Sequence, residues 1–303
     1  MTDTHSCARY ALALLILVFS LLPLAARAAS AAEATYEEQI LEWRQKRNDR
    51  LADDDGWMTL VALEWLQEGE NSVGSRPSSD AVIPGGPDLW GVITLEGDRI
   101  LYRPQPGTGI MVDGAEVDEA VLLADSQGQA TVVRSGDISF HVIDRGSYGL
   151  RVKDRKAPTL LAFSGMPVYD IDPEWRVEGR FIRAPEGETI PISDVLGQTN
   201  PSPVFGTFEF ERDGVQFSLI AIGTEESDSL WFLFADQTSG RETYGAGRFL
   251  YSDGMPEAGR LVVDFNKAYN PPCAYNDYST CPLPPQQNRL RLAVQAGEKK
   301  YHE

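Results

Sequence analysis

The chain has 303 residues, 42% of them hydrophobic, and its 45 acidic and 27 basic side chains give a net charge of −18. A negative charge of this size repels nucleic-acid phosphates and anionic lipid surfaces, so the composition argues against both as partners. The acidic residues are scattered rather than clustered, which is typical of a soluble protein and not of an acidic binding tract.

The first 28 residues have the features of a secretory signal peptide. Arg9 precedes an apolar run from Ala11 to Ala26, and Ala26-Arg27-Ala28 is a small-x-small cleavage site. The apolar run is shorter than the ~20 residues that a membrane-spanning helix needs, and no second run of that length follows. We therefore expect a periplasmic or secreted protein without a membrane span after cleavage of residues 1–28, and an uncleaved anchor is the alternative interpretation.

Residues 35–154 are predicted to form one amphipathic helix followed by a β-sandwich block. Tyr36, Ile40 and Trp43 recur at helical spacing among charged residues, which predicts a helix over 35–52. The apolar segment 57–66 is expected to pack against the first sheet. Short apolar runs separated by turn sequences then predict strands at 91–95, 99–102, 110–112, 131–133 and 138–143. Because no covering helix separates these strands, parallel crossovers are not expected.

The order of motifs in this block is similar to that of forkhead-associated domains, which are β-sandwiches that bind phosphothreonine. The similarity rests on Val73-Gly74-Ser75, the segment 78–83, a predicted hairpin and Val112-Asp113-Gly114. It implies a sandwich. The phosphate-binding Arg-Ser-His set of that family is not evident, with Arg76 the nearest candidate, so the phosphopeptide function is not carried over.

Residues 155–176 are predicted to connect this block to a second β-rich block, residues 177–303. Its strongest local signal is Asp213-Gly214 between two alternating runs, which predicts a two-residue hairpin. The predicted strands are 177–183, 205–212, 215–223, 230–235, 247–251, 259–266 and 290–296. The predicted fold class is therefore mainly β, with two sandwich-like or barrel-like blocks preceded by one amphipathic helix.

The segment from Asp264 to Pro285 contains Cys273 and Cys281, the only cysteines outside the leader, among prolines, amides and phenols. Prolines restrict the backbone and Asn or Asp satisfies local backbone groups, so a stiff loop is expected. In an exported protein, a disulfide between the two cysteines is the first interpretation, and a redox-active pair is the alternative. No metal site is predicted, because zinc needs further Cys or His ligands and the chain beyond the leader has only His141 and His302.

The second block closely resembles the family known as domain of unknown function 1684. The resemblance is carried by 233–244, 247–250, the Asp264–Pro285 segment, 288–290 and 296–298, and similar residues at 56–60 and 65–69 extend it over roughly residues 40–300. It implies a shared architecture and a shared site region, and it implies no reaction.

Polar residues at the ends of successive strands in this block are expected to meet in one cleft. Arg248 is interpreted either as an ion-pair partner of Asp264 across the sheet or as an anchor for a carboxylate or phosphate of a ligand. Asp236-x-Thr238 either closes a turn or belongs to the site. The predicted ligand-binding residues are Arg248, Asp264, Asn266, Tyr269, Asn270 and Tyr244.

Three functions remain open from the sequence. Tyrosines near the loop suit a pocket that stacks a ring, so the first hypothesis is small-molecule or glycan binding in a cleft floored by residues Asp264–Cys281. The second is a hydrolase in which Asp236 and Asp264 serve as acid and base. The third is an envelope scaffold in which the loop plugs a barrel. Nucleotide-binding and nucleophile motifs are absent from the sequence, no cofactor is expected, and the oligomeric state is open.

Overall fold

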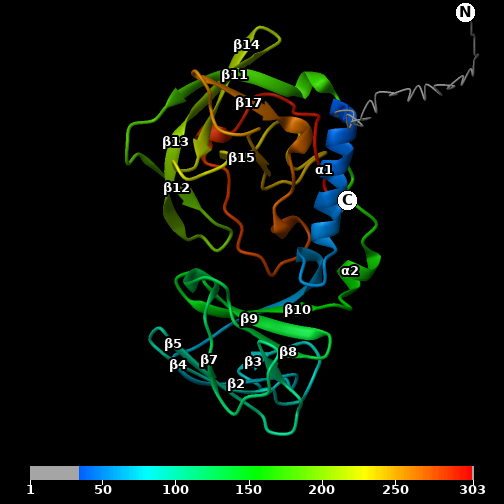
Figure 1. Cartoon of the computed structure of the whole chain (residues 1–303), viewed down its shortest axis with the longest axis vertical. Coiled ribbons are helices and arrows are strands. Elements are labelled where there is room, and N and C mark those ends of the chain that lie inside the picture. The colour runs from blue at the N-terminus through cyan, green and yellow to red at the C-terminus, as the bar shows by residue number, and fades with distance from the viewer. Residues whose placement is uncertain (1–33, 302–303) are drawn as a thin grey trace, which may run out of the picture. The chain divides into compact units, whose positions relative to one another are not determined.

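The computed structural model describes residues 34–301, so the predicted signal peptide lies outside the described residues. From Thr35 onward, the described residues form one compact unit built mainly of β-strands, which confirms the predicted fold class (Figure 1). Within residues 34–301, no helix is both long enough and apolar enough to cross a membrane.

Helix α1 (Tyr36–Leu51) confirms the predicted amphipathic helix and begins with a reciprocal cap. The Thr35 hydroxyl accepts a hydrogen bond from the Glu38 amide at 3.3 Å, and the Glu38 carboxylate accepts one from the Thr35 amide at 2.7 Å. Ile40 and Leu51 are fully buried. A second, short helix, α2 (Pro158–Ala162), begins with a proline and lies in the predicted connector.

The first β-block is a sandwich of two five-stranded sheets. One sheet has the order β1 (Leu60–Trp65), β10 (Tyr148–Asp154), β9 (Ile138–Asp144), β8 (Val132–Ser135), β6 (Met111–Val112). The other has the order β3 (Ala81–Val82), β2 (Gly69–Gly74), β4 (Gly91–Glu96), β5 (Arg99–Pro104), β7 (Ala120–Val121). Both sheets contribute to one core, in which Trp90 and Tyr102 pack on Phe140 at ring distances of 5.7 and 5.9 Å.

Two features of this block differ from the sequence prediction. The apolar segment after α1 contains β1, which is an edge strand of the first sheet and pairs with β10. Strands β2 and β3 pair in parallel over two residues, so the expectation that parallel joining would not occur is wrong here. A covering helix is unnecessary for so short a pair, because Asp80 accepts hydrogen bonds from the amide and hydroxyl of Ser72 at 2.8 and 2.6 Å and fixes the connecting turn. Arg76, in that turn, pairs at the surface with Asp88 at 3.4 Å.

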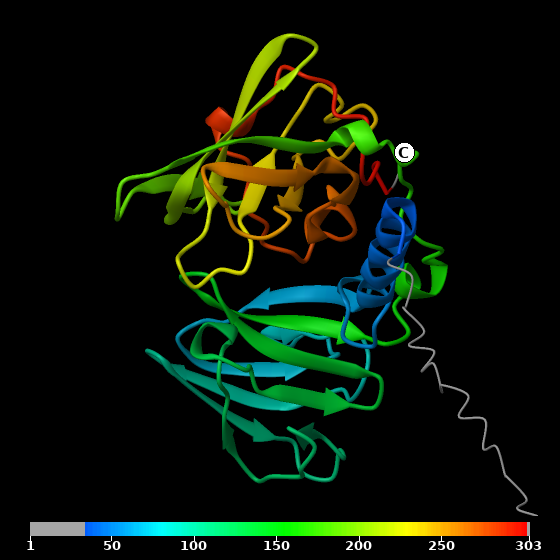
Figure 2. The same ribbon diagram turned by 45° about the horizontal axis from the view of Figure 1, so that its top comes forward.

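The second β-block is a single curled sheet (Figures 1 and 2). Its order is β16 (Arg248–Tyr251), β15 (Trp231–Phe234), β14 (Val215–Ile222), β13 (Thr199–Arg212), β11 (Arg176–Arg183), β17 (Arg260–Asp264), with β12 (Thr189–Ser193) paired to β13. A bridge between Ser252 and Val263 joins the two edges, so the sheet nearly closes into a barrel. Its interior is filled by buried phenylalanines, among them Phe208, Phe232 and Phe265.

The predicted strand at 290–296 is wrong, because this segment forms no strand in the structure. The guanidinium of Arg248 donates hydrogen bonds to the carbonyls of Val294, Ala296 and Glu298, the first at 2.9 Å and the last at 3.2 Å. The amide of Val294 donates to the carboxylate of Asp236 at 3.3 Å. The buried ion pair of Arg248 and Asp236 thus provides the hydrogen-bond partners that a neighbouring strand would otherwise provide for this backbone. The alternation of apolar and polar residues in the sequence does not indicate which groups will pair with the backbone.

Asn288 joins β14 to β15, where only one residue pair, Ile222 with Trp231, links the two strands. Its side-chain oxygen accepts from the Ile220 amide at 2.7 Å, and its side-chain nitrogen donates to the carbonyls of Ile220 and Leu233, each at 2.9 Å. The Asn288 side chain is fully buried. The side-chain amide of Asn288 therefore replaces backbone hydrogen bonds that are missing between β14 and β15 in the barrel wall.

Replacing Asn288 is expected to destabilise the protein strongly. The Asn288→Ala variant leaves one buried and two partly buried backbone groups without partners, and a buried group costs about 1–3 kcal/mol, so a loss of about 2 kcal/mol or more is expected. Urea unfolding measures this loss, with Gln287→Ala at the exposed neighbouring position as the matched control. An Asn288→Ala variant within ~0.5 kcal/mol of the wild type would contradict this role.

Candidate ligand-binding site

Arg248 and Asp236 form a buried ion pair instead of a ligand anchor. Arg248 Nη2 lies 2.8 Å from Asp236 Oδ2, and both side chains have 0% exposure. The partner of Arg248 is thus Asp236, and the pairing with Asp264 considered from the sequence does not occur. The other Asp236 oxygen accepts from the amide and hydroxyl of Thr238 at 2.7 and 2.6 Å, as expected for a turn.

Asp264 and Asn266 belong to a second buried network, which holds α1 against the barrel. The Tyr36 hydroxyl donates to the Asp264 carboxylate at 3.1 Å, and the Asn266 amide nitrogen donates to the Tyr36 hydroxyl at 2.8 Å. Asn266 also exchanges hydrogen bonds with the backbone of Asp172 at 2.8 and 3.1 Å. Burial raises the pKa of Asp264 above its ordinary value. These contacts connect positions 228 and 230 residues apart in the sequence.

Asn270 and Tyr244 hold the Asp264–Pro285 segment in place. The Asn270 backbone amide donates to the Glu298 carboxylate at 2.7 Å, and its side chain donates to the Lys299 carbonyl at 2.7 Å. The Tyr244 hydroxyl donates to the Cys273 carbonyl at 3.0 Å. The structure therefore does not bring the predicted ligand-binding residues together in one cavity, since five of the six bind protein groups elsewhere.

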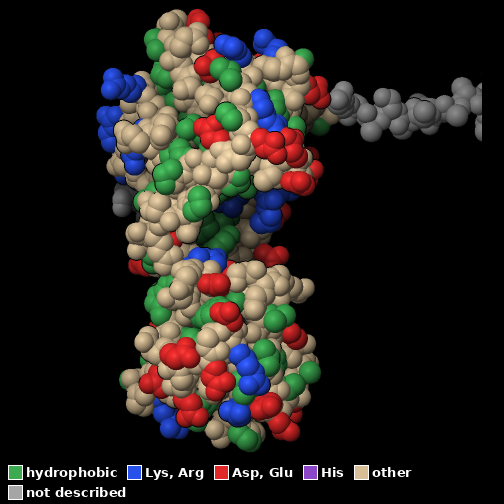
Figure 3. All heavy atoms as spheres, turned by 90° about the vertical axis from the view of Figure 1, so that its left-hand side faces the viewer, with side chains coloured by type: hydrophobic (Ala, Val, Ile, Leu, Met, Phe, Trp, Pro, Cys, Tyr) green, Lys and Arg blue, Asp and Glu red, His purple; other side chains and the backbone are tan. Residues whose placement is uncertain are grey.

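Tyr269 is the exception, because it lines a cavity of about 560 Å³ that we call the aromatic cavity. Helix α1, the segment after it, β15, β16 and the Asp264–Pro285 segment all contribute to its walls. The lining residues are Trp43, Arg47, Arg50, Asp55, Gly56, Trp57, Trp231, Phe249, Tyr251, Tyr269 and Pro272. In the space-filling view of one face, the surface is hollowed between the two β-blocks, and hydrophobic and basic side chains are visible there (Figure 3).

The aromatic wall follows from strand periodicity. Trp231 and Tyr251 are cross-strand partners on β15 and β16, and Phe249 lies two residues from Tyr251 on the same face. Tyr269 continues the sheet beyond β16, because its backbone exchanges two hydrogen bonds with Phe249 at 2.8 and 2.9 Å. The ring of Tyr251 stacks on those of Trp231 and Tyr269 at 6.4 Å in each case, with interplanar angles of 21° and 12°.

The helical wall has Trp43, Arg47 and Arg50 at positions i, i+4 and i+7 of α1, so they share one face. The Arg47 guanidinium lies 4.7 Å from the Tyr269 ring centre. It also donates to the Glu298 carboxylate at 3.2 Å and to the Tyr275 hydroxyl at 2.8 Å. Glu298 is 1% exposed, and burial raises its pKa.

Cys273 comes directly after Pro272, which lines the cavity, and both Cys273 and Cys281 are free thiols in the structure. The predicted disulfide is therefore not present here. The two residues are close neighbours, since the Cys273 amide donates to the Cys281 sulfur at 3.2 Å. The hydrogen bond between the two thiols lowers the pKa of Cys273 and raises that of Cys281.

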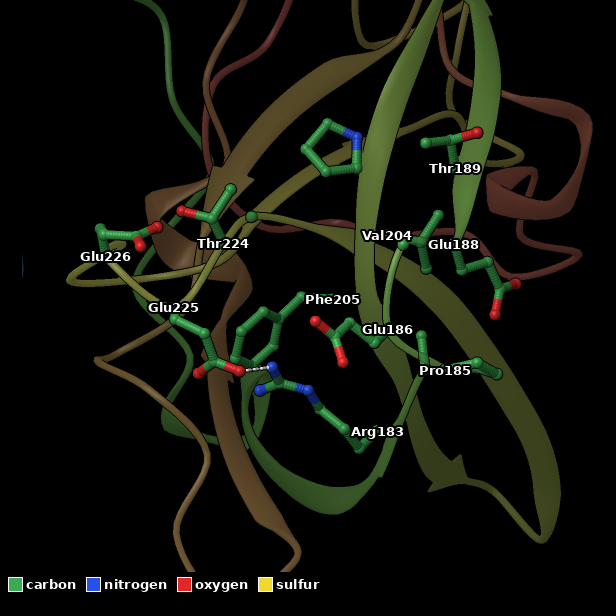
Figure 4. Close-up of a pocket in the computed structure, with 14 residues that line it drawn as sticks. Arg183, Pro185, Glu186, Glu188, Thr189, Val204, Phe205, Thr224, Glu225 and Glu226 are labelled. Carbon is green, nitrogen blue, oxygen red and sulfur yellow. Dashed lines mark hydrogen bonds and ion pairs between the residues drawn. The ribbon is translucent and has the colours of Figure 1, made fainter.

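A hollow at the loops between β11 and β12 and between β14 and β15 is a weaker candidate (Figure 4). Four glutamates line it, and its one cation, Arg183, is paired with Glu225. The guanidinium of Arg183 also covers the Phe205 ring at 3.3 Å from its centre. The one cation and the ring in this hollow are thus already occupied by contacts within the protein.

The lining of the aromatic cavity combines aromatic rings with two guanidinium groups. Its lining includes one carboxylate, Asp55, and neither His nor Cys. Within residues 34–301, no three His, Cys, Asp or Glu side chains gather closely enough to hold a metal ion. Sequence reasoning missed Trp43, Arg47, Arg50, Trp57 and Trp231 as site residues, although the shared face of Trp43, Arg47 and Arg50 on a helix was a usable signal.

Stability is expected to depend on pH through the buried carboxylate of Asp264. Because burial raises its folded pKa, the folded state holds the proton more tightly than the unfolded chain does. Wild type should therefore lose stability relative to Asp264→Asn as the pH rises from the unfolded pKa through the raised folded pKa. Urea unfolding over a pH series measures this difference, with Asp118→Asn at an exposed position as the control. A difference that stays constant with pH would contradict the expectation.

Comparison with known proteins gives a family-model match and a similarity to a solved structure. Residues 161–299 match the family model described as Protein of unknown function (DUF1684). The chain is also similar to an uncharacterized protein of Haloarcula marismortui solved by NMR in solution, with 35% sequence identity over 45% of this chain and 77% of that one, and a TM-score of 0.39. Among curated proteins nothing matches significantly. The family-model match confirms the resemblance to the DUF1684 family over residues 161–299.

Proposed function

We propose that this protein is exported and binds a small ring-containing molecule, such as a sugar or a planar aromatic compound, in the aromatic cavity. The observation that carries the proposal is the stacked row of Trp231, Tyr251 and Tyr269 along one wall. Tyr269 and Pro272 come from the Asp264–Cys281 loop, so this loop contributes part of the cavity wall.

The size and the lining of the cavity support binding. A volume of about 560 Å³ falls in the range of small-molecule sites, which is roughly 300–1,000 Å³. Flat aromatic faces provide area for stacking at a low cost in conformational entropy, because each ring is already held by its neighbours. Tyr251 is 46% exposed, so a ligand that covered it would remove apolar surface from water.

The hydrolase alternative has less support. Its candidate carboxylates, Asp236 and Asp264, accept hydrogen bonds from Arg248 and Tyr36 and do not line the aromatic cavity. A carboxylate that acts as an acid or base must reach the substrate. The scaffold alternative has one favourable observation, the filled interior of the barrel, but the aromatic cavity lies outside that interior.

A thermal-shift screen against sugars, nucleosides and aromatic acids tests the binding proposal. A ligand at 100 times its Kd should stabilise the wild type by about 2.7 kcal/mol and raise its Tm. The Tyr251→Ala variant, which removes a half-exposed ring of the cavity, should lose most of that shift, whereas Leu161→Ala, at a 73% exposed position outside the cavity, should keep it. A screen in which no compound stabilises the wild type, or in which Tyr251→Ala responds fully, would count against binding in this cavity.

Export and thiol oxidation have a separate test. When the full chain is expressed in a bacterium with a periplasm, mass spectrometry of the periplasmic fraction should find a protein that begins near Ala29. Non-reducing peptide mapping of that protein should find Cys273 joined to Cys281, because exported thiols this close together are exposed to oxidation. An intact Met1 in a cytosolic protein would refute export, and two free thiols in the periplasmic protein would refute the disulfide.

A further inference from the structure

The charged residues that line the aromatic cavity, Arg47, Arg50 and Asp55, have a positive net charge, opposite in sign to the net charge of the whole chain, which is −18. The side chain of Arg50, in the last turn of α1, forms no ion pair or hydrogen bond with any of the residues that the structure describes, and it is exposed. The end of a helix contributes about half a negative charge, so the full positive charge of Arg50 exceeds it. A free guanidinium therefore lies at the wall of a cavity lined by rings.

A second cation lies behind the cavity wall. Arg151 is 5% exposed, and its guanidinium carbon is 5.3 Å from the centre of the Trp57 ring. Within residues 34–301, its Nε atom has no hydrogen-bond partner, and no carboxylate lies within ion-pair distance of it. Burial and the neighbouring charge of Arg145 lower the pKa of Arg151 to about 10, so it stays protonated at neutral pH.

The other charges of the cavity are already compensated. Arg47 is paired with Glu298 at 3.2 Å. Asp55, the one carboxylate in the lining, faces two cations on the sandwich block, Arg134 at 3.1 Å and Arg155 at 3.9 Å. The uncompensated charges at the cavity are therefore the positive charges of Arg50 and Arg151.

We infer that the ligand of the aromatic cavity carries an anionic group, a carboxylate or a phosphate, attached to a flat ring, with the ring stacked on Tyr251 and the anion bound by Arg50. This inference rests on the proposed binding function and names the ligand class. A guanidinium binds either anion through paired N–H donors, so the chemistry shared by the two is what the site selects. Arg151 contributes through its field, because a poorly hydrated cation acts over a longer distance than an exposed one.

Matched naphthalene probes test the inference by isothermal titration calorimetry. 2-Naphthoate and 2-naphthyl phosphate carry the anion, and 2-naphthamide has the same ring without the charge. Wild type is expected to bind at least one anionic probe about tenfold more tightly than 2-naphthamide. Added salt should weaken the binding of the anionic probe and leave the binding of 2-naphthamide unchanged. The Arg50→Gln variant should bind that probe about 5- to 10-fold more weakly and should bind 2-naphthamide unchanged.

The control removes an equal charge from the same helix. Lys46→Gln, at a 67% exposed position that pairs with Glu42 and lies outside the cavity lining, should leave all three affinities unchanged. The inference would be overturned if charged and neutral probes bound equally, or if the Arg50→Gln variant bound the anions as tightly as wild type does. Either result would still be consistent with the proposed binding of a ring-containing molecule. If the thermal-shift screen and all three probes show no binding up to about 1 mM, both the inference and the proposed function fail.

Discussion

The buried ion pair between Arg47 and Glu298 is the contact on which the described residues most depend. It joins the first helix to the last residues of the barrel block, and the two side chains are only 11% and 1% exposed. Such a pair stabilises a fold only when its remaining hydrogen-bonding groups are satisfied. Here the Tyr275 hydroxyl, the Asn270 amide and the Asn270 carbonyl satisfy them. By fixing Arg47, the pair also fixes the face of α1 that carries Trp43 and Arg50.

Polar residues in this protein therefore have mainly structural roles, and aromatic residues line the cavity, which is the opposite of what their residue types suggest. Amides and carboxylates such as Asn266 and Asp264, which look like site residues, are internal connections. Tryptophans such as Trp43 and Trp57, which look like core residues, line the cavity. Both outcomes follow from one rule: a buried polar group must find a partner, and a protein partner serves as well as a ligand. The faces of aromatic rings have no such requirement and can remain partly exposed.

The fold was predictable where its causes are local. The α1 helix follows from its apolar spacing, and the Asp213-Gly214 hairpin follows from two residues with φ of 53° and 75°, which these residue types tolerate. The segment 290–296 was not predictable, because its backbone partners are side chains of Arg248 and Asp236 more than 40 positions away. Of the predicted site residues only Tyr269 lines the aromatic cavity, since residue type alone does not indicate which partner a polar side chain will find.

The hydrogen bonds that hold α1 in place have a consequence for the order of folding. Those to Asp264, Asn266 and Glu298 connect it to residues 228 to 251 positions later in the chain. Closing such long loops slows folding, so α1 can complete its contacts with the barrel only after nearly the whole chain is available. Until then, the face of α1 that carries Trp43 and lines the cavity in the folded protein stays exposed to solvent. Apolar surface that is exposed during this interval favours aggregation, whereas in the finished molecule the barrel covers part of the same face.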